Sequence, residues 1–189
     1  GLDLLEKGET ISGDSPAAKF CSNIDKFAFY RRELFDGKDC KDILSATLRP
    51  EGLGYGAKSK GQLLFHKYDD GCRTAFEEHL VEGALYAADA QGNVNIVFSV
   101  SPEHLEAYKV LFESVRSHYE DTYKVRYNIT FTLQSPSTDT VAANPDGTPF
   151  RKADGSLLFR PGGHGALIGN VGNVDADVVI IKNIDNVVH

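Results

Sequence analysis

The 189-residue chain contains no methionine and no tryptophan, and it has only three cysteines. Cys21, Cys40 and Cys72 are widely spaced and include no C-x-x-C pair, which excludes a disulfide-rich scaffold and a zinc site of that type. We therefore expect three buried thiols in a reducing compartment. Because the chain begins at Gly1 and lacks methionine throughout, we also expect it to be a fragment of a longer protein.

A basic surface is also missing, because 20 Lys and Arg residues stand against 27 Asp and Glu residues, for a net charge of -7. Without clustered cations to contact phosphates, a general nucleic-acid binder is excluded. No apolar stretch approaches the roughly 18 residues of a membrane span, and the N-terminus has no secretion-signal pattern. The composition is that of a globular domain, and we expect a cytoplasmic protein with neither nucleic-acid nor membrane partners.

The pattern of apolar residues predicts an N-terminal helical segment over residues 1–57. A helix is expected over 15–35, with Ser15 as its cap and Pro16 in its first turn. A shorter helix is expected over 39–48. Residues 49–60 contain one proline and three glycines, which indicates a long loop or a domain boundary.

Residues 58–189 are expected to form an α/β core. The predicted strands are 63–66, 94–100, 126–133 and 178–183, with helices at 74–88, capped by Thr74, and after Ser101-Pro102. A hairpin or an edge strand is expected at 151–159 around Asp154-Gly155, and a short helix within 163–174. Alternating strands and helices predict a mainly parallel sheet with helices on both faces.

Ligands of such sheets bind at the carboxyl ends of the strands, where the informative residues should fall. The loop Pro161-Gly162-Gly163-His164-Gly165 offers bare main chain at a predicted helix start, so that a planar ring or a phosphate can approach it. The alternative is a tight turn that needs positive φ, with His164 only capping the helix.

Three further candidates stand at predicted element ends. Asp185 lies between two amides in Asn183-Ile184-Asp185-Asn186, a natural place for Mg²⁺ that bridges phosphates, or else an Asx turn. Gln134 carries an amide able to read a base edge, although one glutamine alone identifies no base. Lys60 precedes the first strand and is able to meet a phosphate, although a solvated loop charge is the simpler interpretation.

One acidic cluster invites a metal interpretation that we do not adopt. Glu77, Glu78, His79 and Glu82 share one predicted helix but do not match H-E-x-x-H, so we expect a solvent-facing polar stripe.

Several motifs resemble known families when they are taken together and in order. The segments 60–61, 73–80, 131–134, 161–165 and 183–186 resemble the core of the nucleotide-sugar pyrophosphorylases, in their uridylyltransferase branch. The segments 65–68, 136–140 and 159–168 are similar to the bacterial family called domain of unknown function 4301.

The resemblance to the pyrophosphorylases implies a Rossmann-like nucleotidyltransferase fold of glycosyltransferase-A type. It implies that the glycine loop holds the uracil, that Gln134 touches the base and that Lys60 binds phosphate, although Gly61 replaces the residue that usually follows this lysine. It also implies that Asp185 lies by the Mg²⁺ ion and the sugar phosphate. The nucleotide-binding set is then Gln134, Gly162, Gly163, His164, Gly165 and Asn183, and the catalytic pair is Lys60 and Asp185.

The implied reaction joins a nucleoside triphosphate and a sugar 1-phosphate and releases pyrophosphate. Alignment and charge neutralisation would drive it, so that no nucleophilic side chain is needed. Nothing in residues 1–13 matches the glycine-rich loop that opens the family, and the chain stops just after the metal motif. We therefore expect a core incomplete at both ends and an inactive isolated chain. The alternatives are a non-catalytic module that binds a nucleotide or nucleotide sugar, and a glycosyltransferase, for which Asp175-Ala176-Asp177 would be the metal motif although it precedes the last strand.

Overall fold

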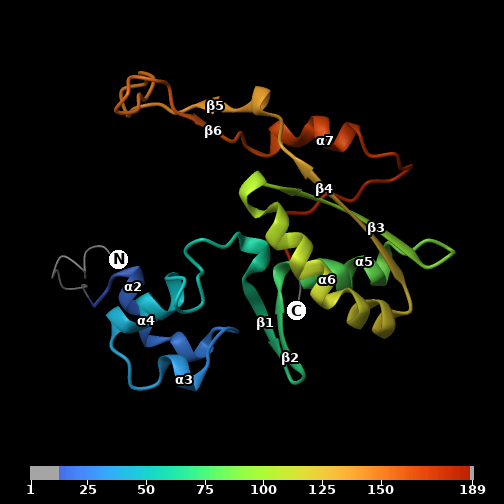
Figure 1. Ribbon diagram of the computed structural model, residues 1–189, viewed down its shortest axis with the longest axis horizontal. Coiled ribbons are helices and arrows are strands. Elements are labelled where there is room, and N and C mark those ends of the chain that lie inside the picture. The colour runs from blue at the N-terminus through green and yellow to red at the C-terminus, as the bar shows by residue number, and fades with distance from the viewer. Residues whose placement is uncertain (1–12, 188–189) are drawn as a thin grey trace. The chain divides into compact units, whose positions relative to one another are not determined.

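The computed structural model describes residues 13–187, which fall into two compact units (Figure 1). Unit 1 comprises residues 1–86 together with 183–189, and unit 2 comprises residues 87–182. The N-terminal helical segment and the last motif of the chain therefore belong to the same unit. Among the described residues, no helix is both long and apolar enough to cross a bilayer.

Unit 1 begins with three short helices, α2 (Pro16–Ser22), α3 (Arg32–Phe35) and α4 (Cys40–Leu48). The predicted cap is confirmed, because the Ser15 hydroxyl accepts a hydrogen bond from the Ala18 amide. The continuous helix expected over 15–35 is wrong, since α2 ends at Asn23, whose side-chain amide donates to the Lys19 carbonyl. Such a side chain competes with the helical hydrogen bonds. The core of this region consists of Ile24, Phe29, Phe35 and Ile43.

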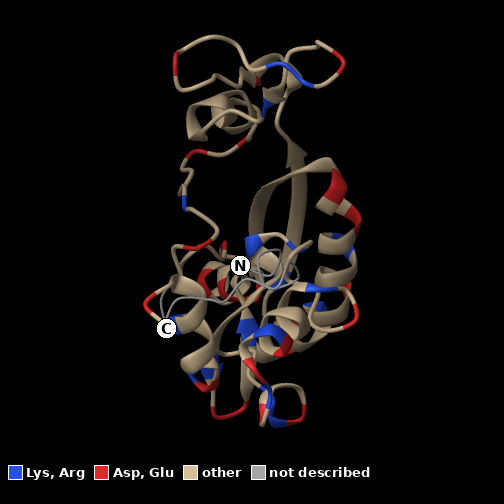
Figure 2. Cartoon of the chain, turned by 90° about the vertical axis from the view of Figure 1, so that its left-hand side faces the viewer, with Lys and Arg blue, Asp and Glu red and all other residues tan. Residues whose placement is uncertain are grey.

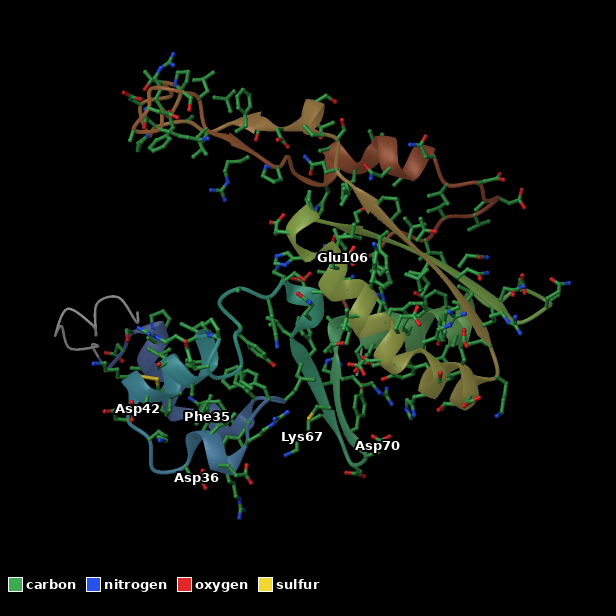
Figure 3. All side chains as sticks on the ribbon, in the orientation of Figure 1. Phe35, Asp36, Asp42, Lys67, Asp70 and Glu106 are labelled. Atoms are coloured by element: carbon green, nitrogen blue, oxygen red, sulfur yellow. A yellow bond between two sulfur atoms is a disulfide. The ribbon has the colours of Figure 1, made fainter. Side chains whose placement is uncertain are left out.

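Cys21 in α2 and Cys40 in α4 form a disulfide, with their Cα atoms 5.4 Å apart (Figure 3). The expectation of three thiols is wrong for this pair, because the fold brings together two cysteines that the sequence separates. Cys72 is free and half-buried, and its Sγ donates to the Ala28 carbonyl. We expected a reducing compartment because we expected three unpaired thiols. The Cys21–Cys40 disulfide therefore removes the basis of that expectation.

A β-hairpin and a helix follow in unit 1. Strand β1 (Leu64–Tyr68) pairs antiparallel with β2 (Gly71–Thr74), and α5 (Ala75–Tyr86) begins directly after β2. The predicted Thr74 cap is confirmed: its Oγ1 accepts from the Glu77 amide, and the Glu77 carboxylate accepts from the Thr74 amide. Phe76 and Leu80 are fully buried, so that α5 lies at the centre of unit 1.

Unit 2 contains the one parallel strand pair of the described chain. Strand β3 (Asn93–Val100) lies parallel to β4 (Arg126–Leu133), and α6 (Leu105–Tyr123) connects them. One face of this sheet packs on α6, where the rings of Tyr108 and Phe131 lie 6.1 Å apart. The opposite face carries polar pairs such as Asn95 with Asn128. A parallel sheet that is covered on one face only is unusual.

Three antiparallel arms meet at a junction further along unit 2. Strands β5 (Thr140–Val141) and β6 (Phe159–Arg160) form the stem, and two hairpins, closed at Ala143↔Pro149 and Arg151↔Leu157, form the other arms. The hairpin predicted at 151–159 is thereby confirmed. Three main-chain hydrogen bonds close a ring through residues spaced eight apart: Ala142, Phe150 and Leu158. Figure 2 shows the two hairpins at the top, with acidic positions in red at their outer ends.

The chain then forms a 3₁₀ turn (His164–Leu167) and α7 (Ile168–Gly172). The short helix predicted within 163–174 is thereby confirmed. The stem places two segments beside each other: residues 134–139, which lead into β5, and residues 161–165, which leave β6. This proximity brings the glycine loop to the end of β4.

The expected mainly parallel, Rossmann-like fold is wrong. The described residues form three separate two-stranded sheets, of which two are antiparallel. The strand expected at 63–66 pairs with β2 in a hairpin, and the one expected at 178–183 does not form. Val178 and Ile181 are 78% and 73% exposed, respectively. An apolar run becomes a buried strand only where a neighbouring edge accepts it, and no strand in residues 13–187 does so.

We expect reduction of the Cys21–Cys40 disulfide to lower the free energy of unfolding by about 3 kcal/mol, because the bond restricts the unfolded chain. The bond joins residues that are 19 positions apart. Urea denaturation followed by circular dichroism, with and without reductant, measures the change. Cys72→Ser is the matched control and should keep its response to reductant. A wild-type midpoint that reductant does not move would contradict the prediction.

Candidate functional site

The glycine loop of unit 2 is packed closely at its first glycine. A Cβ atom on Gly162 would lie 2.8 Å from the Thr138 carbonyl oxygen and 2.9 Å from Ala166 Cβ. No larger residue fits at this position without a shift of the main chain. The same Cβ position lies 3.5 Å from Gln134 Nε2, so the loop and the end of β4 share one corner of unit 2.

The other two loop glycines have no comparable reason to be glycine. None of Gly162, Gly163 and Gly165 has a positive φ, and a Cβ atom on Gly163 or Gly165 would meet nothing within 4 Å. His164 is exposed and does not cap the helix, since Gly163 is at the cap position. The alternative of a positive-φ turn with a histidine cap is therefore wrong, and the loop presents bare main chain to open space.

Gln134 lies directly after β4 and is half-buried. Its Nε2 donates to Asp139 Oδ1 at 3.3 Å, which orients the amide within the corner. The end of β4 is held from another side, because Asn170 of α7 donates to the Leu133 carbonyl at 2.9 Å. Sequence reasoning did not single out Asp139 or Asn170, whose hydrogen bonds hold Gln134 and the Leu133 carbonyl in place.

Lys60 and Asp185 meet in unit 1 although 125 positions separate them. Lys60 Nζ donates to Asp185 Oδ2 at 2.7 Å, and the two side chains are 67% and 41% exposed. Asp185 stands in a turn, closed by a hydrogen bond from the Asn186 amide to the Asn183 carbonyl. The turn is anchored on α5, because His79 Nε2 donates to the Ile184 carbonyl at 3.1 Å. An exposed ion pair of this kind contributes little to stability.

The candidate site residues thus divide between the units. Unit 2 holds Gln134 and the glycine loop, and unit 1 holds Lys60, Asn183 and Asp185. Residues 13–187 contain no group of three or more His, Cys, Asp or Glu side chains placed to hold a metal ion. Asp185 offers a single carboxylate, which suits Mg²⁺ only where phosphate oxygens and water complete the shell.

A buried charge cluster that sequence reasoning missed lies under the β1–β2 hairpin. Glu78 of α5 is 2% exposed, and its Oε1 accepts from Tyr68 OH at 2.7 Å and from His66 Nδ1 at 3.0 Å. Arg73 Nη1 lies 3.7 Å from Glu78 Oε2, and its guanidinium lies over the Tyr68 ring. Since a buried carboxylate needs such donors, the cluster fixes the hairpin on the helix.

The expected solvent-facing stripe on this helix is therefore wrong. Glu78 is buried, Glu77 belongs to the capping box, and His79 is bonded to the Ile184 carbonyl. One signal in the sequence points to the cluster. His66 and Tyr68 are two positions apart and therefore lie on the same face of β1, and Arg73 is opposite His66 in β2.

The chain belongs to the family described as Domain of unknown function (DUF4301), whose model matches residues 3–189. The expected membership in this family is confirmed. No curated protein and no solved structure matches the chain significantly.

The buried cluster predicts a pH dependence of stability. Burial, and then the hydrogen bond to Glu78, raises the pKa of Tyr68 from 10.0 to about 12. The folded state thus keeps the phenol protonated where the unfolded chain ionises, so the stabilisation is complete below pH 10 and is lost as the pH rises to about 12. We expect Tyr68→Phe to lose less stability than the wild type over this range, as measured by urea unfolding.

The matched control is Tyr86→Phe, because the Tyr86 hydroxyl also donates to a glutamate, Glu82, but the side chain is 52% exposed. This variant should follow the wild-type pH profile. Identical alkaline profiles for Tyr68→Phe and the wild type would show that Tyr68 is not the responsible group.

Proposed function

We propose that unit 2 binds a uridine nucleotide at the loop formed by residues 161–165. One observation carries the proposal: Gly163 and Gly165 are glycines although neither their φ angles nor their surroundings require it. A flat ring is able to lie directly against main chain that carries no Cβ atom. The absence of side chains at Gly163 and Gly165 would therefore leave room for a ligand.

Gln134 supplies a hydrogen-bonding group for the base. Its Nε2 donates to Asp139, so that the amide oxygen is the atom that would accept a hydrogen bond from the base. Uracil offers its imide N–H as the donor to this oxygen. The preference for uridine over adenosine rests on the resemblance of segments 131–134 and 161–165 to the uridylyltransferases, because adenine also offers N–H donors, at its exocyclic amino group.

Uridylyl transfer to a sugar 1-phosphate is a second candidate function, and the contact between Lys60 and Asp185 favours it. In this reaction an oxygen of the sugar phosphate attacks the α-phosphorus of the nucleoside triphosphate. The bond from that phosphorus to the bridging oxygen breaks, and pyrophosphate leaves with the electron pair. Lys60 would neutralise phosphate charge, and Asp185 would hold Mg²⁺ together with phosphate oxygens.

A module that binds the nucleotide without chemistry fits the geometry of unit 2 equally well, and activity of the full protein separates it from the transferase. The glycosyltransferase alternative has less support. Asp175 and Asp177 are exposed and belong to no metal-binding group among the described residues.

We expect Gly163→Val to weaken the binding of a uridine nucleotide about tenfold or more, because the side chain would occupy the space proposed for the ring. Isothermal titration calorimetry with UTP and ATP measures the effect and the preference for uridine. Gly169→Val is the matched control, since Gly169 in α7 is also open within 4 Å. Equal affinity for UTP and ATP, or unchanged binding by Gly163→Val, would refute the base site.

We expect Asp185→Asn to abolish the Mg²⁺ dependence of sugar 1-phosphate binding, because the carboxylate is replaced by a neutral amide of the same shape. The free energy of unfolding should change by less than about 1 kcal/mol, since the ion pair is exposed. Calorimetric titrations with and without Mg²⁺, together with urea unfolding, provide both readings. Asp175→Asn is the control, and a loss of Mg²⁺ dependence in this variant alone would favour the glycosyltransferase alternative.

A further inference from the structure

A groove of about 400 Å³ lies between α6 and β4 in unit 2. Its lining is apolar along Phe112, Ile129 and Phe131, and charged at Lys109, Glu113 and Arg116, which all belong to α6. Phe112 is buried, whereas Ile129 and Phe131 are half-buried. The groove therefore offers apolar surface beside a strand.

In β4 the main-chain N–H and C=O groups of the odd-numbered residues point away from β3 and toward this groove. The Tyr127 amide donates to the Glu120 carboxylate of α6 at 3.0 Å, and the Leu133 carbonyl accepts from Asn170 at 2.9 Å. The Arg126 amide instead donates to the Gly92 carbonyl, on the β3 side. Ile129 and Phe131 share the direction of Tyr127, since successive residues of a strand alternate. No strand within residues 13–187 pairs with this outer edge of β4.

The same unit carries an exposed run that has the composition of a strand. Val178, Val179, Ile180 and Ile181 are 78%, 41%, 59% and 73% exposed. All four are β-branched, a class enriched in strands. Figure 1 draws the run in red, as coil that follows α7. It joins no strand ladder of the described chain.

We propose that the outer edge of β4 receives residues 178–181 of a second copy of this chain, which add to it as an antiparallel strand. Main-chain hydrogen bonds from Ile129 and Phe131 would hold the added strand, and its alternate side chains would enter the groove. The contact covers at once an open sheet edge and an exposed apolar run, each of which invites association in water.

Charge selects the antiparallel direction. Because β4 runs back along α6, Lys109 lies toward the Leu133 end of the groove, as the contact between Tyr108 and Phe131 shows. An antiparallel strand brings Asp177, just before the run, to this end. Its side chain then lies on the same side of the added strand as Val179 and Ile181, which enter the groove. A parallel strand would instead bring Asp177 to Arg116 at the other end, where the guanidinium is already bonded to Glu120 at 3.0 Å. Lys109 already contacts Glu106 on its own helix, but an exposed pair of this kind yields easily to a second carboxylate.

The second copy is the occupant because one chain carries both halves of the contact. If each copy inserts its run into the groove of the other, a two-fold dimer forms two identical contacts and leaves neither edge open. Within one copy the run lies in solvent, as its exposure shows.

Analytical ultracentrifugation over a concentration series tests the proposal on the whole chain. The wild type should form a species of twice the 20.7 kDa chain mass. The double variant Ile180→Asp, Ile181→Asp should dimerise about tenfold more weakly or not at all, because it replaces apolar side chains of the added strand, which would pack on Phe112, Ile129 and Phe131, by carboxylates. Val110→Asp is the matched control, since Val110 on α6 is 70% exposed and does not line the groove.

A charge exchange tests the direction and the partner. Lys109→Glu and Asp177→Lys should each weaken the dimer, and the double variant Lys109→Glu, Asp177→Lys should restore it. A wild type that stays monomeric at all concentrations would overturn the proposal. Lowered stability of the monomer in Ile180→Asp, Ile181→Asp, without any dimer in the wild type, would show that the run occupies the groove of its own chain and would also overturn it.

Discussion

A carboxylate removed from water has to be surrounded by donors, and in unit 1 this requirement is met at Glu78. The donors come from Tyr68, His66 and Arg73, which belong to both strands of the β1–β2 hairpin. The hairpin is thus fixed on α5 by polar contacts as well as by the apolar side chains beneath it. The next residue of the same helix, His79, holds the Ile184 carbonyl, and Lys60 just before β1 holds Asp185. The β1–β2 hairpin and the turn at residues 183–186 are therefore both bonded to α5, and the hairpin is bonded to it through a single buried carboxylate.

In unit 2 the corresponding constraint is main-chain pairing. The pairs Thr140↔Arg160 and Val141↔Phe159 join two segments that leave the corner on either side. Gln134 and Gly162 approach each other because that stem is closed and because Gly162 carries no side chain. This arrangement leaves Gly163, His164 and Gly165 available for contacts outside the chain.

Local chemistry in the sequence predicts much of the structure. Ser15 and Thr74 cap helices as expected, and α6 with its two parallel strands agrees with the periodicity of the apolar residues. What fails depends on distant neighbours. The run at 178–181 has the composition of a buried strand, but burial requires an adjacent edge, about which the run itself carries no information. Glu78 was expected to face solvent because its helix shows no H-E-x-x-H pattern, and its three partners lie on the two strands of the preceding hairpin. Among the candidate site residues, the proximity of Gln134 to Gly162 and of Lys60 to Asp185 agrees with the order of motifs, whereas the division between two units was not foreseen.

The ring through Ala142, Phe150 and Leu158 uses one donor and one acceptor from each residue, and both hairpins beyond it close on their own Asp-Gly turns. The ring is therefore complete whatever the length of the hairpins, which are free to lengthen or shorten without a change at the stem. An insertion at Gly147 or Gly155 would be absorbed at the tip of a hairpin, where both glycines have positive φ angles and open surroundings. The junction thus separates Gln134 and Gly162 from changes in length at the hairpin tips. The two tips are also suitable attachment points for a fused peptide or a label.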